Sequence, residues 1–329
     1  MADRPALPPG AATGVGSLPG TDIVEATRVV LGELPDLPHL PELPARGPGA
    51  DMIGRSAALL AEFPVELYAG RWQTCDRPGR DLRQALDFLD RDLDTLTEQA
   101  DGFAGVLKVQ SAGPWTLAAS VQRQTGGAIL RDPGAVRDLT DSLTEGLREH
   151  LADLARRIPG ATLILQLDEP SLPAVLAGAV PTESGLARYR PVEAPVASAR
   201  LRSLVEAMAV PVVVHSCAPN VPVALLAETG AAGIAVDMAL LNLDKAADLD
   251  PFGEALDGGM WLFAGSDAAD PGAAARRLWQ RLGLTPARLP EQVVVTPPCG
   301  LAGRTPAEAR RVLDACREAG RRLREDPEG

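Results

Sequence analysis

Eight short apolar runs recur along this chain, and amphipathic or alanine-rich stretches separate them. This alternation is typical of repeated βα units, in which helices bury the faces of parallel strands. The expected strands cover residues 11–16, 37–43, 105–110, 161–167, 210–215, 232–237, 260–265 and 293–297. Because eight parallel strands close into a barrel more readily than they form an open sheet, we predict an α/β fold, a single (β/α)8 TIM barrel.

The stretches between these runs carry apolar residues at spacings of three and four, with charged residues opposite. This period predicts the outer helices. They are expected over residues 81–100, 133–157, 196–208, 220–229, 270–282 and 305–323. A short oxygen-bearing side chain, with or without a following proline, is a good helix start. The expected starts are Asp81, Asp132, Asp270 and Thr305.

Residues 35–50 and 178–195 are rich in proline and glycine, which predicts loops over the carboxyl ends of the strands. Barrel enzymes keep their substrate contacts there. No linker interrupts the 329 residues, and a single α/β barrel reaches this length. We therefore expect one domain over residues 1–329.

The charge pattern narrows the class of partner. The formal net charge is -12, and no basic run exceeds two residues, so nothing indicates binding to nucleic acid or to an anionic membrane. Small molecules or other proteins are the expected partners. The first residues lack the apolar core of a signal peptide, and nowhere do 18 apolar residues follow one another. We expect a soluble, cytoplasmic protein.

Metal-capable side chains come directly after several apolar runs. His215 and Cys217 follow VPVVV, Asp237 follows AGIAV, and Cys299 follows VVVTPP. In a barrel the carboxyl ends of the strands converge on one face, so these four side chains are expected to meet there. Two thiolates, one imidazole and one carboxylate suit a tetrahedral zinc site.

Each of these residues also has a purely structural interpretation. A backbone carbonyl can satisfy a buried histidine, and a buried free cysteine often acts as a small hydrophobe. The shared position at strand ends favours the zinc site. Cys75 and Cys316 lack that position, and Cys316 is predicted to be a core residue of the last helix.

The predicted ligand set indicates a kind of chemistry. Zinc with two thiolates, an imidazole and a carboxylate carries a net charge of about -1, which makes it a weak Lewis acid for water. It still stabilises an incoming thiolate near neutral pH. Thiol alkylation therefore suits this site better than hydrolysis.

Three further motifs lie at expected strand ends. Asp168 and Glu169 in QLDEP can hold an ammonium group or move a proton, or one of them caps a helix. The turn GVGSLP, residues 14–19, offers amides to a substrate carboxylate. Trp115 in SAGPWT can present a flat face to a ring or a methyl donor, or pack beneath a loop.

Taken in order, these motifs resemble the catalytic barrel of cobalamin-independent methionine synthase. The matching segments are GSLP at 16–19, QSAGPWT at 110–116, QLDEP at 166–170, HSC at 215–217 and PPCGL at 297–301. The resemblance covers about Gly14 to Arg322, and the HxC and CGL pair is its most specific part. In that family, zinc bound by one His, two Cys and an acidic residue activates homocysteine for methyl transfer from methyltetrahydrofolate.

By this resemblance His215, Cys217 and Cys299 match the zinc ligands. The acidic ligand of the family is a glutamate, and this chain offers Asp237, one methylene shorter.

The resemblance also assigns the substrate contacts. Asp168 matches a carboxylate that holds the amino group of homocysteine, and Glu42 is our choice for the second contact. Ser17 falls in the segment that binds the substrate carboxylate, and Trp115 in the segment near the folate.

Two departures from the family concern the methyl donor. The family has a catalytic histidine after the seventh strand, whereas here LFAGSDAADP contains none, and Asp267, the acid nearest to that strand, is the expected catalytic residue in its place. Full-length members carry an additional amino-terminal barrel that helps to grip the folate. Short members resemble this chain more closely, and a methylated corrinoid protein is an alternative donor for them.

Three functions follow. The first is a zinc-dependent methyltransferase that acts on homocysteine, with methyltetrahydrofolate or a methyl-corrinoid protein as donor. The second is zinc-dependent alkyl transfer to or from another small thiol. The third is a barrel that binds a ligand without turnover, which the missing histidine favours and the paired thiolates do not.

Overall fold

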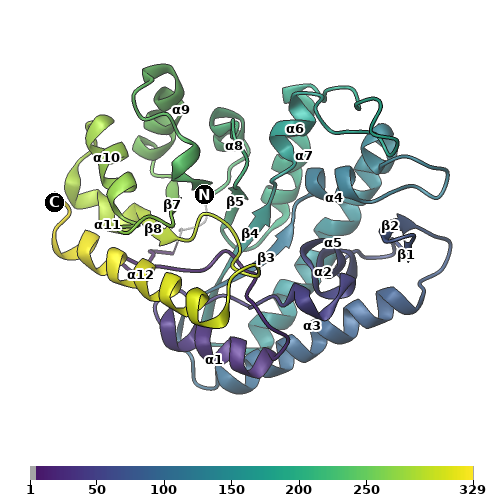
Figure 1. The fold of residues 1–329 in the computed structure, drawn as a ribbon, viewed down its shortest axis with the longest axis horizontal. Helices are drawn as coiled ribbons and strands as arrows, with labels where there is room; N and C mark the ends of the chain where they lie inside the picture. Colours follow the sequence, from purple (N-terminus) through teal and green to yellow (C-terminus); the bar gives the residue numbers. More distant parts are fainter. Residues whose placement is uncertain (1–4, 329) are drawn as a thin grey trace.

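Parallel strands form the centre of the molecule, and helices cover them from outside (Figure 1). The computed structural model describes residues 5–328. Six strands pair in chain order as one parallel sheet. They are β3 (Gly105–Ala112), β4 (Ala161–Asp168), β5 (Val212–Ser216), β6 (Gly233–Asp237), β7 (Trp261–Gly265) and β8 (Val293–Thr296). These six correspond to the last six predicted strands, which confirms the α/β class.

The eight-stranded barrel is confirmed only in part, because residues 11–16 and 37–43 do not form regular strands. They make isolated bridges instead. Prolines within 37–43 remove ladder donors, and glycines within 11–16 weaken an extended segment. The bridges link β8 to β3 by way of these two segments: Ala12 pairs with Val295, Ser17 with Glu42, and His39 with Lys108.

All six predicted helices are present. They are α3 (Arg80–Gln99), α5 (Pro133–Arg157), α7 (Ala194–Ala207), α8 (Val223–Glu228), α10 (Ala273–Arg281) and α12 (Pro306–Glu325). Two predicted starts are confirmed, since Asp132 caps α5 and Thr305 caps α12 in a capping box with Glu308. The other two, Asp81 and Asp270, were wrong, because α3 and α10 begin after glycines.

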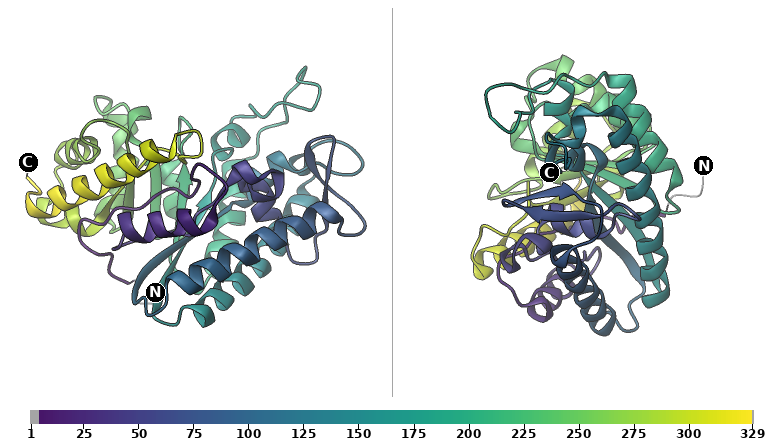
Figure 2. Two further views of the ribbon diagram at one scale, coloured as in Figure 1. Left: turned by 60° about the horizontal axis from the view of Figure 1, so that its bottom comes forward. Right: turned by 90° about the vertical axis from the view of Figure 1, so that its right-hand side faces the viewer.

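Several shorter elements lie outside the predicted set. They are α1 (Ile23–Glu33), α2 (Met52–Ala58), α4 (Pro114–Ser120), α6 (Leu172–Leu176), α9 (Ala246–Asp257) and α11 (Leu289–Gln292), the 3-10 turns η1 (Pro44–Arg46), η2 (Pro48–Ala50), η3 (Ile129–Arg131), η4 (Met238–Leu240) and η5 (Pro286–Arg288), and the hairpin of β1 (Val65–Tyr68) and β2 (Arg71–Thr74). Figure 2 shows α1 beside α12, so helices from the two ends of the chain pack together. Among the described residues, no helix combines the length and apolarity that crossing a membrane requires.

Alternation along the strands separates two cores. Leu107 and Val109 of β3 face the helices, where Cys316 of α12 is also buried, as predicted. Val106 faces the inside of the curled sheet, together with Trp261 and Phe263 of β7. The inner core supports the carboxyl ends of the strands from below.

Replacing Gly146 with alanine is expected to destabilise the fold. A Cβ at this position of α5 would lie 1.5 Å from the carbonyl oxygen of Leu59, so the helix and the loop would have to separate. We expect the free energy of unfolding to fall by about 1–3 kcal/mol, the usual cost of overpacking. Urea denaturation measures it.

Gly32→Ala in α1 is the matched control, because a Cβ there meets nothing within 4 Å. It should leave the stability unchanged or raise it by up to about 1 kcal/mol, since alanine favours helix. Equal stability of the two variants would contradict this account of Gly146.

Candidate functional site

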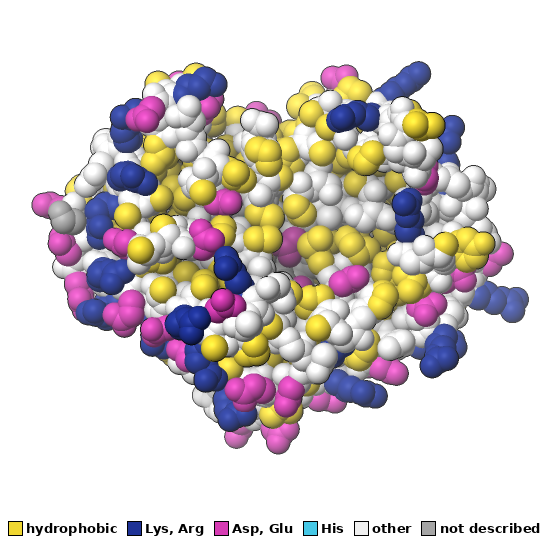
Figure 3. Space-filling view, in the orientation of Figure 1, with side chains coloured by type: hydrophobic (Ala, Val, Ile, Leu, Met, Phe, Trp, Pro, Cys, Tyr) yellow, Lys and Arg dark blue, Asp and Glu magenta, His cyan; other side chains and the backbone are white. Residues whose placement is uncertain are grey.

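A cavity of about 270 Å³ lies where β4, β5 and β8 end. Six of the predicted site residues line it, and they come from segments far apart in the sequence. These six are Ser17, Glu42, Asp168, His215, Cys217 and Cys299. Figure 3 shows hydrophobic side chains gathered toward the hollowed middle of one face, with charged side chains of both signs around them.

The two cysteines of this cavity face each other. The Sγ atoms of Cys217 and Cys299 are 3.3 Å apart. Two sulfurs that each lie about 2.3 Å from a tetrahedral zinc ion are separated by about 3.8 Å, so a shift of about 0.5 Å would accommodate the ion. The sulfur pair therefore fits a shared metal.

A hydrogen bond between the two thiols shifts their pKa values in opposite directions. The Cys217 thiol stabilises the Cys299 thiolate and, with the Gly300 amide, lowers the pKa of Cys299 to about 6. The same bond and burial raise the pKa of Cys217. A cation between the two sulfurs would favour the loss of both protons.

His215 is buried at the end of β5, and only one of its ring nitrogens has a partner. Nδ1 lies 2.7 Å from Oδ1 of Asp168. Nε2 has no hydrogen-bond partner among the described residues. A buried polar atom without a partner is costly, and a ligating nitrogen explains it.

Glu42 brings a second carboxylate to the cavity. It is buried, accepts a hydrogen bond of 3.1 Å from Nε2 of Gln110, and lies 3.7 Å from Nε of Arg55. Burial raises its pKa to about 6, with Arg55 opposing the shift and Asp168 adding to it. Glu42 and Asp168 therefore form a pair of carboxylates that a cationic group would stabilise.

Ser17 contacts the loop that carries Cys299. Its carbonyl oxygen accepts a hydrogen bond of 2.8 Å from the amide of Leu301. A Cβ on Gly300 would lie 2.0 Å from the Ser17 hydroxyl, so glycine permits this close approach. The first bridging segment and the last loop are thereby joined at the cavity.

Three predicted site residues do not line this cavity. Asp237 caps η4, where it accepts a hydrogen bond of 2.9 Å from the amide of Ala239. Trp115 is buried, and its indole donates to the carbonyl of Ala197. Asp267 is exposed and paired with Arg304 beside a separate hollow.

Between residues 5 and 328, no three His, Cys, Asp or Glu side chains are already arranged to hold a metal ion. The ligand prediction therefore requires the side chains of His215, Cys217 and Cys299 to rearrange around a common point.

The acidic pair of QLDEP has two different roles. Glu169 is fully buried and accepts hydrogen bonds from the amides of Trp115 and Thr116 and from the Thr116 hydroxyl. Burial raises its pKa to about 7, although these bonds oppose the shift. Glu169 therefore caps α4, and Asp168 alone faces the cavity.

Sequence analysis missed the buried charges beneath the site. Arg55 lies in α2, which was not predicted, so nothing marked it as buried. Lys108 left a clearer signal, because a lysine inside the apolar run GVLKVQ must face a polar partner.

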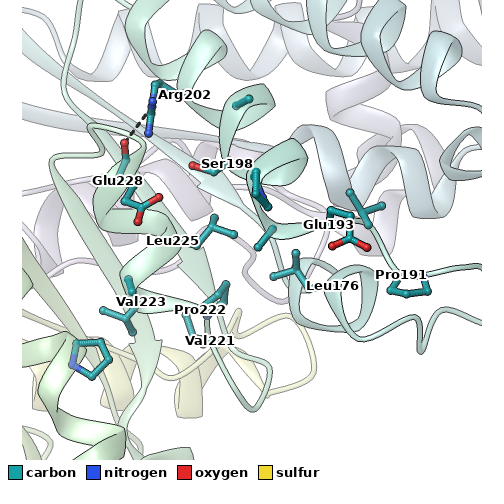
Figure 4. A pocket seen from close by; sticks show the side chains of 16 residues that line it. Leu176, Pro191, Glu193, Ser198, Arg202, Val221, Pro222, Val223, Leu225 and Glu228 are labelled. Carbon is teal, nitrogen blue, oxygen red and sulfur yellow. Dashed lines mark hydrogen bonds between the residues drawn. The ribbon is translucent and has the colours of Figure 1, made fainter.

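A larger groove of about 820 Å³ lies apart from these residues (Figure 4). Aliphatic and proline side chains from residues 191–195, α7 and α8 line most of it, and Arg202 at its edge donates to the carbonyl of Glu228. It contains none of the predicted site residues.

Comparisons with known proteins show the family of the chain and a shared fold. Residues 10–322 match the family model described as cobalamin-independent synthase, catalytic domain. No curated protein sequence matches the chain. Two solved structures similar to it are a B12-independent methionine synthase from Shewanella sp. W3-18-1 in complex with selenomethionine, and a putative dihydrodipicolinate synthetase from Pseudomonas aeruginosa.

The two structural similarities differ in strength. The Shewanella structure has a TM-score of 0.59 at 12% identity, over 98% of this chain and 99% of that one. The Pseudomonas structure has a TM-score of 0.41 at 10% identity, over 97% and 81%. At these identities the first shows a shared fold, and the second carries no argument.

Proposed function

The chain belongs to the family of the cobalamin-independent synthase catalytic domain, and from this premise we propose that it methylates the thiol of homocysteine with the help of zinc. One observation carries the proposal: the sulfurs of Cys217 and Cys299 lie 3.3 Å apart in the cavity that the half-partnered ring of His215 also lines. A site for ligand binding alone has no evident need for two thiolates around one cation.

His215 through Nε2, and Cys217 and Cys299 through their sulfurs, would hold the zinc ion. When bound, zinc supplies positive charge that keeps a thiol sulfur deprotonated and nucleophilic at neutral pH. Asp237 would join this set only by releasing the amide of Ala239.

The remaining side chains of the cavity suit the other groups of homocysteine. Glu42 and Asp168 would hold the ammonium group, because a cation relieves the repulsion between two buried carboxylates. Ser17 lines the cavity with its hydroxyl beside Gly300, where it would contact the substrate carboxylate. Met52, Pro44 and Pro170 add apolar walls that would exclude water from the sulfur.

The methyl donor is proposed from the family. Its members work without cobalamin, so a corrinoid protein as donor gains no support. We propose methyltetrahydrofolate. The substrate sulfur attacks the methyl carbon, the sulfur–carbon bond forms as the nitrogen–carbon bond breaks, and the folate nitrogen takes up a proton. The bound selenomethionine of the Shewanella structure, a methylated selenium amino acid, supports a product of this shape.

Removing the amino group from the substrate is expected to weaken binding strongly. Zinc-loaded protein should bind homocysteine about 10–150-fold more tightly than 4-mercaptobutanoate, which lacks only the amine, because a charge-assisted hydrogen bond contributes about 1.5–3 kcal/mol. Glu42→Gln should reduce this preference and leave 4-mercaptobutanoate binding unchanged. Isothermal titration calorimetry measures both ligands.

The same preference should depend on pH. The raised pKa of Glu42, about 6, means that its carboxylate becomes neutral below pH 6 and no longer attracts the ammonium. Homocysteine affinity should therefore fall below pH 6. Equal binding of homocysteine and 4-mercaptobutanoate would contradict the proposed function. Tight binding of another small thiol, without binding of homocysteine, would favour alkyl transfer to or from that thiol instead.

A further inference from the structure

A buried hydrogen-bond chain leads from β3 to the imidazole of His215. Nζ of Lys108 donates to Oε1 of Gln166 over 2.6 Å, and Nε2 of Gln166 donates to Oδ1 of Asp168 over 2.7 Å. The same Oδ1 lies 2.7 Å from Nδ1 of His215. All four side chains are buried, and Lys108 is not exposed at all.

Lys108 fixes the direction of the first two bonds in this series, and the acceptor-only carboxylate of Asp168 fixes the third. An ammonium group only donates, so the amide of Gln166 must turn its oxygen toward Lys108 and its NH2 toward Asp168. Oδ1 of Asp168 thereby accepts from Gln166. An ionised carboxylate only accepts, so the partner nitrogen of His215 must donate.

A proton on Nδ1 of His215 leaves Nε2, on the other side of the imidazole, free to bind a metal. A neutral histidine that carries its proton on Nδ1 has a free lone pair on Nε2, and the bond made by one ring nitrogen sets the state of the other. Nε2 is the nitrogen without a partner. A metal ion needs that lone pair, and a carboxylate bonded to the other ring nitrogen of a ligating histidine affects metal affinity.

The backbone supports the same orientation of the amide. Nζ of Lys108 and Nε2 of Gln166 both donate to the carbonyl oxygen of Val15, each over 2.9 Å. Burial lowers the pKa of Lys108 to about 8, while Asp168 and Glu42 oppose the shift, so the ammonium persists at neutral pH. A reversed Gln166 amide would place its NH2 against the ammonium.

We propose that Lys108 is a positioning residue, whose donor-only ammonium orients Gln166 and Asp168 so that His215 keeps its proton on Nδ1 and offers Nε2 to a metal. This inference rests on the proposed function, in which His215 is a zinc ligand. Lys108 touches neither substrate nor metal in this arrangement.

The tautomer of His215 tests the inference directly. The chain has three histidines, so long-range ¹H–¹⁵N correlation spectra of metal-free protein labelled in the imidazole nitrogens will be simple, and His215→Asn identifies the signal of His215. Wild-type protein at pH 7.5 should show the Nδ1–H form. Lys108→Met removes the donor, shortens the side chain by only one atom, and should yield a mixture with the Nε2–H form.

Zinc affinity is the second measurement. Chelator competition should give a higher Kd for zinc in Lys108→Met, with an increase of at most about 10–100-fold, the effect of losing a group bonded directly to a metal ligand. Val109→Ala is the matched control, because the next residue of β3 faces the helices and its side chain has no hydrogen-bonding atom. It should leave both the tautomer and the Kd unchanged.

Unchanged tautomer and zinc Kd in Lys108→Met would overturn the inference. If that variant does not fold, Gln166→Met removes the middle link and should also populate the Nε2–H form, whereas a pure Nδ1–H signal there would overturn the inference. Wild-type protein that binds no zinc would count against the proposed function alone, since the spectra of metal-free protein still decide the role of Lys108.

Discussion

Cys299→Ser is expected to lower the zinc content from about one ion per chain to near zero and to reduce methyl transfer by at least about 1,000-fold. A serine hydroxyl remains protonated at neutral pH and is a far weaker zinc ligand than a thiolate. The loss corresponds to about 4 kcal/mol of transition-state stabilisation. Cys217→Ser should behave in the same way, because the two sulfurs face each other. Elemental analysis and initial rates measure the two effects.

Cys75→Ser is the control for this pair. The Cys75 thiol donates to the carbonyl of Arg77, and the residue does not line the cavity. It should keep both zinc and activity. Protein that retains about one zinc ion per chain in both site variants would refute the assigned ligands.

Asp92→Asn should produce the largest loss of stability. Asp92 is fully buried and accepts two hydrogen bonds of 2.7 Å from the guanidinium of Arg46, and another from Arg55. Removing its charge leaves two guanidinium groups facing each other beneath the site. Loss of one partner from a buried ion pair costs about 3–5 kcal/mol. We expect a decrease of this size in the free energy of unfolding, measured with urea.

Asp138→Asn is the matched control, because its pair with Arg137 is largely exposed. Exposed pairs contribute little, so the stability of this variant should be close to that of the original chain. Since Arg55 also approaches Glu42, Asp92→Asn should in addition weaken homocysteine binding. An unchanged free energy of unfolding in Asp92→Asn would show that the buried ion pairs of Asp92 with Arg46 and Arg55 do not stabilise the fold.

The six sheet strands were predictable because each contains a buried run of apolar residues, which are largely β-branched in β5 and β8. Such runs as VPVVV and EQVVVT suit few other structures. Segments 11–16 and 37–43 were harder, since proline and glycine interrupt their pairing while tertiary contacts still place them beside β8 and β3. The short helices α2 and α4 depend on packing that no local period reveals.

The candidate site was predictable where a strand end alone fixed the direction of a side chain. His215 lies on β5, and Cys217 and Cys299 follow soon after strands, so sheet geometry carries them to one cavity. Asp237 also ends a strand, but a local hydrogen bond to the amide of Ala239 turns its carboxylate into a cap. The sequence alone does not tell whether such an aspartate caps the next turn or binds a metal.

The contact between Ser17 and Leu301 has a consequence for biosynthesis. Two adjoining parts of the cavity wall come from segments that the ribosome makes nearly 300 residues apart. At roughly 5–20 residues per second, the early segment waits for many seconds before its partner emerges. Metal uptake should therefore follow translation, and a nascent polypeptide that stalls before Cys299 should carry no zinc.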